Sequence, residues 1–259
     1  MSANVVVDRT SWGRLHVTGA DATRFLQGLT TVNVEALADG AHGWGAILNP
    51  KGRVLSVIDI AKLGEAYLVA CESTIADATR ALLEKYAVMD DVTFEPITGP
   101  AHQVWETVID VWRAPIVEGT SDASRDENEP QVERLRIRAG FPRYGIDVDE
   151  GHFPFETPLV QFLDYKKGCY VGQEPVFRVH AQGNAARTLR GLRIEGADPV
   201  APGTQIKHPA KDNAGAVTSS VVEGELTLAL GYLHRTAWDV GAIVDIGGRK
   251  ATVHELPWP

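Results

Sequence analysis

The segment richest in groups that could do chemistry runs from Lys166 to Glu174 and reads KKGCYVGQE. Its thiol, Cys169, follows two adjacent lysines, whose ammonium groups favour the thiolate over the thiol and make the sulfur more nucleophilic. Glycines on either side of the Cys-Tyr pair allow the backbone to bend sharply or to approach a ligand closely. The segment therefore predicts a loop that carries a reactive cysteine.

The same segment opens a stretch of positive charge in an acidic protein. The chain has 25 Lys and Arg against 34 Asp and Glu, a net charge of −9, which disfavours general affinity for nucleic acid or anionic membranes. Between residues 166 and 193, six basic residues stand against Glu174 alone, which leaves a local charge of +5. The basic residues are Lys166, Lys167, Arg178, Arg187, Arg190 and Arg193. This stretch predicts a site for an anionic ligand.

A structural interpretation of these residues stays open. A cysteine among glycines is commonly a small buried residue, and Lys-Arg clusters commonly form a solvated surface. The other cysteine, Cys71, follows an apolar run at residues 68–70, which favours a buried structural thiol. The two cysteines lack a Cys-x-x-Cys spacing, so neither a disulfide framework nor a closed cysteine-ligated cluster is expected.

The bulk composition is typical of a globular protein. The chain has 259 residues, of which 44% are hydrophobic and 23% charged, enough for one large or two modest domains. No apolar run approaches the roughly 20 residues that span a bilayer, and the first residues lack a basic region followed by an apolar segment. We expect a cytoplasmic protein without a membrane partner.

Strands alternate with helices before the cysteine motif. Residues 15–17 predict a strand that enters a helix with Asp21 as its N-cap, and residues 54–69 predict a β-hairpin. Thr74 predicts the N-cap of an amphipathic helix that continues to Tyr86. This half is therefore expected to be α/β or α+β.

The segment Glu118–Pro130 has five acidic residues, one basic residue and almost nothing apolar to bury. This composition predicts a solvated loop or a boundary within the domain.

The last third of the chain loses its helical periodicity. Short apolar runs recur at residues 189–194, 226–233, 242–246 and 251–254. The pair Gly247-Gly248 lies between the last two runs, where a two-residue hairpin needs positive φ. These features predict a small antiparallel barrel or sandwich, with the main boundary near residue 186.

The string from Lys167 to Glu174 resembles the signature of the YgfZ family, folate-binding proteins of iron-sulfur cluster assembly and repair. That family is related in fold to the glycine-cleavage T-protein. Other landmarks of the family follow in order along essentially the whole chain. They are Gly19-Ala20-Asp21 with Phe25 to Leu29, Asn49 to Arg53, Arg138 to Pro142, and Pro154-Phe155-Glu156.

The resemblance implies an α+β fold. Residues 1–186 would form an aminomethyltransferase-type folate-binding domain of two α/β lobes, and residues 187–259 a C-terminal antiparallel β-barrel that closes a ring-like molecule. The boundary inferred from the strand pattern agrees with this division.

The resemblance also implies that tetrahydrofolate or a derivative binds beside the signature loop, with Cys169 as the working residue and no stably bound metal. The anionic tail of folate suits Lys or Arg, and its flat pterin suits an aromatic wall with amide or carboxylate partners. Gln173 and Glu174 could equally satisfy the backbone of their own turn. The expected ligand contacts are Lys167, Tyr170, Gly172, Gln173, Glu174, Arg178, Asn49 and Lys51.

The resemblance therefore implies a folate-binding accessory factor for assembly or repair of iron-sulfur proteins. Cys169 would act as a thiolate in transient ligation or redox exchange, the partners would be iron-sulfur client or assembly proteins, and the chain is expected to be a monomer.

Two alternatives remain. A folate-dependent one-carbon (aminomethyl) transferase is disfavoured, because Ser56-Val57 replaces the acidic pair of T-proteins and Arg138 replaces a glutamate. The nearest acidic residue, Asp59, shares a strand face with Val57 and could reach a ligand from there, but it is expected at the surface. A binding protein related to RNA modification is supported only by the basic stretch, so direct binding of nucleic acid is not expected and effects on tRNA modification would be indirect.

Overall fold

A five-stranded antiparallel sheet, in the order β3-β4-β5-β2-β6, forms the middle of the N-terminal part. The computed structural model describes residues 4–181, 183 and 185–258. The strands of this sheet are β2 (Gly13–Thr18), β3 (His42–Leu48), β4 (Val54–Leu63), β5 (Ala66–Cys71) and β6 (Thr93–Pro96). Strands β3 to β5 are buried over most of their length because both faces of the sheet are covered.

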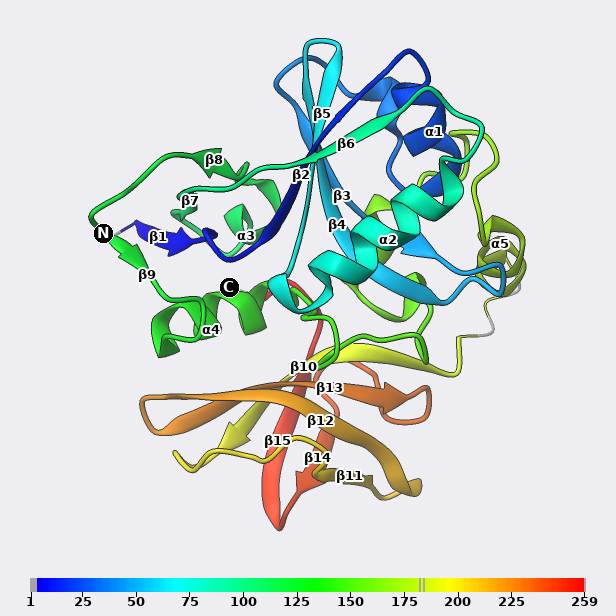
Figure 1. Cartoon of the computed structure of the whole chain (residues 1–259). Helices are drawn as coiled ribbons and strands as arrows, with labels where there is room; N and C mark the ends of the chain where they lie inside the picture. Colours follow the sequence, from blue (N-terminus) through cyan, green and yellow to red (C-terminus); the bar gives the residue numbers. More distant parts are fainter. Residues whose placement is uncertain (1–3, 182, 184, 259) are drawn as a thin grey trace.

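Helices α1 (Ala22–Leu29) and α2 (Ala76–Tyr86) lie on one face of this sheet (Figure 1). In α1 the apolar residues Phe25, Leu26 and Leu29 recur at helical spacing and are buried against the strands. The opposite face of the sheet carries alternate residues of the same strands, such as Trp44 and Val57, and belongs to a separate core cluster. The period of two in β4 therefore divides its side chains between two cores.

A second sheet, in the order β8-β7-β1-β9, forms the other lobe of the N-terminal part. Its strands are β1 (Val5–Asp8), β7 (Ala101–Trp105), β8 (Val117–Glu118) and β9 (Ser124–Arg125), and helices α3 (Asp110–Arg113) and α4 (Pro130–Ala139) accompany it. Between the two sheets lies an aromatic core, in which Trp44 makes edge contacts with Trp12, Trp112 and Phe141. This core joins the two lobes.

Two 3-10 helices lie within the N-terminal part: η1 (Val34–Ala36) between α1 and β3, and η2 (Ser73–Ile75) between β5 and α2. The 3-10 helices η3 (Pro154–Glu156) and η4 (Pro158–Phe162) and the α-helix α5 (Gln173–Ala181) lie between α4 and the barrel.

Six strands close into a C-terminal antiparallel barrel, in the order β10-β13-β12-β11-β14-β15, with β15 pairing back onto β10 (Figure 1). They are β10 (Arg187–Glu195), β11 (Gln205–His208), β12 (Lys211–Glu223), β13 (Leu226–His234), β14 (Ile243–Ile246) and β15 (Arg249–His254). Gly247 and Gly248 both have positive φ, 61° and 84°, in the hairpin between the last two strands. That hairpin is as predicted from its glycine pair.

A buried ion pair joins the barrel to helix α4. The Asp147 side chain is fully buried, and one oxygen accepts from Nη1 of Arg136 at 2.7 Å. Its other oxygen accepts from the hydroxyl of Ser219 at 2.7 Å, and the hydroxyl of Thr218 also donates to it. Burial alone would lower the pKa of Arg136, but the charges of Asp147 and Glu133 raise it. One carboxylate thereby holds α4 and strand β12 together.

The structure confirms the α+β class, the hairpin of β4 and β5, and the C-terminal barrel. Thr74 as a helix N-cap is wrong: residues 73–75 form the 3-10 helix η2, and α2 follows with Ile75 at its N-cap position. Asp21 does precede α1, but its carboxylate accepts from the backbone N of Asp91 at 2.9 Å instead of capping the helix. Among the described residues, no helix is long and apolar enough to cross a membrane.

Replacing Asp147 by Ala is expected to lower the free energy of unfolding by about 3–5 kcal/mol, because Arg136 would keep a buried charge that has lost its main partner. Urea denaturation of the purified protein measures this. The matched control is Asp149→Ala, which removes a carboxylate whose side chain is 56% exposed and should cost about 1 kcal/mol or less. Equal losses in the two variants would contradict a special role for the Asp147 pair.

Candidate functional site

The signature loop, residues 167–172, lies against the C-terminal end of α1. The side-chain amide of Gln27 donates to the backbone O of Lys167 at 2.7 Å, and the backbone N of Val171 donates to the O of Gly28 at 3.1 Å. These two bonds fix the loop at both ends of the Gly-Cys-Tyr sequence.

Lys167 points into the protein. Its ammonium donates to the backbone oxygens of Thr30 at 2.5 Å and Val32 at 2.6 Å, and it lies 5.0 Å from the centre of the Tyr170 ring. Loss of hydration on burial lowers the pKa of Lys167 to about 7. The observed contacts of this lysine therefore position the loop, and its predicted contact with a ligand stays a prediction.

Tyr170 lies in the aromatic core between the lobes, with its ring buried. Its hydroxyl is also buried and has no hydrogen-bond partner within the part of the chain that the structure describes. Burial raises the pKa of Tyr170 to about 12, so the phenol stays protonated at neutral pH and can donate. An unpaired buried hydroxyl is costly, and a ligand acceptor would remove that cost.

Gly172 packs directly on the turn that follows β3. Its φ is 81°, and a Cβ atom built on it would lie 2.5 Å from the backbone O of Asn49, so the position requires glycine. The side-chain oxygen of Asn49 accepts from the backbone N of Lys51 at 2.9 Å and of Arg53 at 3.0 Å. Asn49 thus closes the turn, while Lys51 is exposed.

Cys169 is exposed, so the alternative of a small buried residue is wrong for this thiol. Gly168 before it has φ 94° with open space around it. Downstream, Gln173 and Glu174 begin α5, and the Glu174 carboxylate pairs with Arg178 one turn later, both side chains being largely exposed. Cys71, in contrast, is buried, and burial raises its pKa to about 11, as expected for a structural thiol.

The predicted site residues therefore fall into two groups on three adjoining elements. Lys167, Tyr170 and Gly172 face the interior, and the side-chain oxygen of Asn49 is bonded within its own turn. Cys169, Glu174 and Arg178 are exposed, as is Lys51. The three elements are the signature loop, the turn at residues 49–53 and the start of α5, where Pro175 and Val176 lie against Gly52.

The positions that distinguish this chain from a T-protein are occupied by internal contacts. Ser56 is buried, and its hydroxyl lies 2.8 Å from that of Thr79. Asp59 is only 3% exposed, which contradicts the expected surface aspartate, and its carboxylate lies 2.7 Å from Nδ1 of His42. Burial alone would lower the pKa of His42, but the hydrogen bond and charge of Asp59 raise it. Arg138 pairs with Glu223 of the barrel at 2.6 Å.

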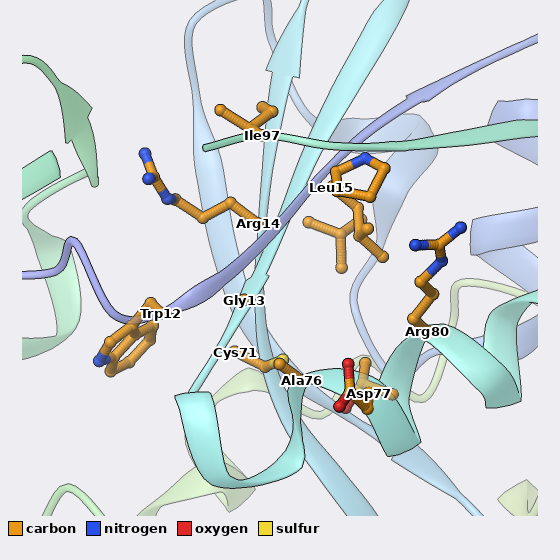
Figure 2. Close-up of a pocket in the computed structure, with 12 residues that line it drawn as sticks. Trp12, Gly13, Arg14, Leu15, Cys71, Ala76, Asp77, Arg80 and Ile97 are labelled. Atoms are coloured by element: carbon orange, nitrogen blue, oxygen red, sulfur yellow. The ribbon is translucent and has the colours of Figure 1, made fainter. Parts of the chain in front are cut away.

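Two of the cavities in the described part of the chain lie away from the signature loop. One, of about 170 Å³, lies between β2, β5 and the start of α2, and Figure 2 shows Cys71, Ala76 and Asp77 near one another on its border. The other, of about 530 Å³, is an open groove where the barrel meets residues 146–152, with Arg187 and Tyr232 in its lining. Neither is lined by residues 166–174.

Sequence reasoning missed a charge cluster that contains the buried Arg9 and the half-buried Glu127 and Arg143. The three residues come from widely separated positions, and Glu127 is one of five acidic residues in a segment that composition describes as solvated. The available signal was weak: an arginine two positions after the apolar run Val5-Val6-Val7.

Residues 1–105 match the family model described as the GCVT N-terminal domain. The "tRNA-modifying protein YgfZ" of Cronobacter sakazakii is 24% identical over 263 residues, covering 83% of this chain and 80% of that protein. The "Iron-sulfur cluster assembly factor IBA57, mitochondrial" of Mus musculus is 27% identical over 268 residues, covering 83% and 74%. This chain is similar in sequence to the YgfZ and IBA57 proteins.

The fold comparison agrees with this kinship. The crystal structure of glycine cleavage system aminomethyltransferase T from Bartonella henselae matches with a TM-score of 0.84 at 17% identity, over 98% of this chain and 86% of that one. The chain therefore has the aminomethyltransferase T fold, and the predicted resemblance is confirmed.

The buried state of Lys167 gives stability a defined dependence on pH. Its folded pKa, about 7, is below the usual value of about 10.4, so the unfolded chain binds more protons between these values and stability rises with pH. The free energy of unfolding of the wild type, relative to Lys167→Met, should increase by roughly 1 kcal/mol per pH unit between about pH 7.5 and 9.5. Urea denaturation across this range is the measurement.

Lys166→Met is the matched control, because Lys166 is exposed beside it. That variant should keep the wild-type slope. If Lys167→Met kept it as well, Lys167 would have an ordinary pKa in the folded protein.

Proposed function

We propose that this protein binds tetrahydrofolate or a derivative and acts as an accessory factor in the assembly or repair of iron-sulfur proteins, with Cys169 as its reactive group. The similar mouse protein supports the iron-sulfur role, because it is named as an iron-sulfur cluster assembly factor, whereas the similar Cronobacter protein is named as a tRNA-modifying protein. These names mention neither folate nor a cysteine, so the binding of folate and the reactivity of Cys169 are argued from the site itself.

The observation that carries the proposal is an exposed thiol on a loop that is otherwise anchored. Cys169 is accessible to a partner, while its neighbours Lys167 and Tyr170 are buried. Accessible thiolates are the cysteines that ligate metals or exchange with disulfides. Among the described residues, no group of three or more His, Cys, Asp or Glu side chains could hold a metal ion. We infer that Cys169 meets a cluster only transiently and shares it with ligands of the partner protein.

The residues around the loop fit part of a folate. The buried hydroxyl of Tyr170 has no hydrogen-bond partner among the residues that the structure describes and can donate to a pterin acceptor. The exposed cations Lys51 and Arg178 suit the anionic tail, and Gln173 and Glu174 offer amide and carboxylate groups. When bound, a reduced folate would supply a carrier of one-carbon units. Lys167 would act indirectly, by keeping Tyr170 in place.

An aminomethyl transferase is the weaker alternative. The hydroxyl of Ser56 is paired with Thr79, and the carboxylate of Asp59 is paired with His42. A general base must reach the proton that it removes, and both of these side chains are committed elsewhere. The RNA-related alternative gains no support from a protein of net charge −9.

Cys169→Ala should fail to restore the activity of iron-sulfur enzymes to cells that lack this protein, because an alanine supplies no sulfur ligand. Enzyme activity would fall to the level of the deletion strain, while the purified variant keeps its thermal midpoint and its affinity for tetrahydrofolate. Cys71→Ala is the control: it removes the other, buried thiol, and should restore activity to the extent that it folds. Full restoration by Cys169→Ala would eliminate the thiolate role.

Tyr170→Phe tests folate binding. It removes one hydroxyl from a buried site, so the Kd for tetrahydrofolate should rise by about tenfold, the value of one hydrogen bond. Titration calorimetry of both proteins measures this, with Tyr86→Phe on α2 as the matched control that should bind like the wild type. Absence of tetrahydrofolate binding by the wild-type chain would refute the folate part of the proposal.

A further inference from the structure

Four residues form what we call the Arg9 cluster: Arg9, Trp12, Glu127 and Arg143. One oxygen of the Glu127 carboxylate accepts from Nη1 of Arg9 at 2.8 Å and from the indole N of Trp12 at 3.0 Å. Its other oxygen lies 3.4 Å from Nη2 of Arg143. A single carboxylate is therefore bound by three donors from separate parts of the chain.

Arg9 is also held by contacts that do not involve Glu127. Arg9 is 4% exposed, its Nε donates to the side chain of Gln103 at 2.8 Å, and its guanidinium lies 4.3 Å from the ring of Trp12 and 5.2 Å from that of Trp105. Burial lowers the pKa of Arg9 to about 10, so it remains charged at neutral pH. A rigid cation that has lost its water needs an anion.

The anion is supplied by an exposed segment. Residues 118–126 are exposed apart from the partly buried Ser121, and the segment joins its sheet through the two-residue strands β8 and β9. It is also held at its start, where Glu118 pairs with Arg14 and the backbone N of Gly119 donates to the O of Pro100. The neighbours of Glu127, Asp126 and Asn128, are exposed. Release of Glu127 would therefore disturb little of the buried core.

The surroundings of the cluster offer further donors and no full replacement for the anion. A small cavity of about 10 Å³ adjoins it, lined in part by Trp105, whose buried indole N–H has no partner among the described residues. Glu72 lies 3.9 Å from Nε of Arg143, and burial raises its pKa to about 7, so it is only partly ionised at neutral pH. Without Glu127, two guanidinium groups would face a site suited to a carboxylate.

We propose that the Arg9 cluster is a binding site for a ligand carboxylate, and that Glu127 occupies it until the ligand displaces this side chain. This inference rests on the proposed function, and the ligand group would be the glutamate tail of a reduced folate. Trp12 and Trp105 belong to the same core cluster as Tyr170, so the aromatic core connects the signature loop with the Arg9 cluster. Ligand binding breaks the contacts of Glu127 with the cluster, so residues 118–129 lose this attachment to the core.

Two ligands separate this site from folate binding in general. Tetrahydrofolate carries the glutamate tail, and a simple tetrahydropterin lacks it. Glu127→Gln weakens the internal competitor, so it should tighten tetrahydrofolate by about tenfold and leave the tetrahydropterin unchanged. Glu129→Gln, two residues away at a half-buried position that pairs with Arg125 instead of Arg9, should change neither Kd. Titration calorimetry on the full chain gives all four values, together with those of the wild type.

Unchanged tetrahydrofolate affinity in a folded Glu127→Gln protein would overturn the inference, as would equal affinity of the wild type for both ligands. In each case binding of a pterin would leave the proposed function standing. A wild type that binds neither ligand would refute the proposed function itself, and the inference with it.

A second measurement needs no variant. Trypsin cleaves after arginine, and Arg125 lies in the exposed segment. Tetrahydrofolate should accelerate cleavage at Arg125 severalfold, because displacement of Glu127 frees the segment, and tetrahydropterin should not. Unchanged or slower cleavage at saturating tetrahydrofolate would contradict the displacement of Glu127.

Discussion

The structure depends most on one constraint: a charged side chain that is buried away from water must have hydrogen-bond or ionic partners. Arg136 and Asp147 are both buried, and each is held by several partners: Arg136 by Glu133 and a backbone oxygen, Asp147 by two barrel hydroxyls. A buried ion pair adds little net stability, but any arrangement that separates its two charges costs several kcal/mol, because each charge is then buried without a partner. It therefore specifies how α4 and the barrel meet more strongly than it stabilises their contact.

The same constraint explains the form of the signature loop. A buried ammonium must find acceptors, and Lys167 finds them in the backbone oxygens of Thr30 and Val32. The lysine that the sequence offers as an activator or ligand contact is thus directed inward, and Cys169, two residues later, remains exposed on the anchored loop. The buried contacts of Lys167 hold the loop in the conformation that leaves the thiol of Cys169 exposed.

Predictions from the local sequence were best where a short pattern allows a single backbone conformation. The alternation in β4 predicts a strand of a hairpin, and the glycine pair at 247–248 predicts a tight turn, and both are confirmed. Strand β12 was missed because its sequence, KDNAGAVTSSVVE, is polar and small, and pairing with β13 over most of its length overrides its weak propensity. Asp59 was misplaced because its burial depends on His42, a partner on the neighbouring strand that no local pattern reveals.

In the candidate site, too, the backbone of the loop could be predicted from the sequence, but the directions of its side chains could not. Glycine chemistry and the order of residues indicated a tight loop at 168–172, but which side chains point inward depends on carbonyls and turns distant in sequence. Glu127 shows the limit most clearly: five acidic residues in one segment are equivalent by composition, and only one meets Arg9. The segment is solvated in general, as its composition predicts, and one of its carboxylates nevertheless pairs with Arg9, a buried cation directly after β1. The charge pattern of a segment indicates its average environment. It does not indicate which single side chain, such as Glu127, departs from that average to form a specific contact.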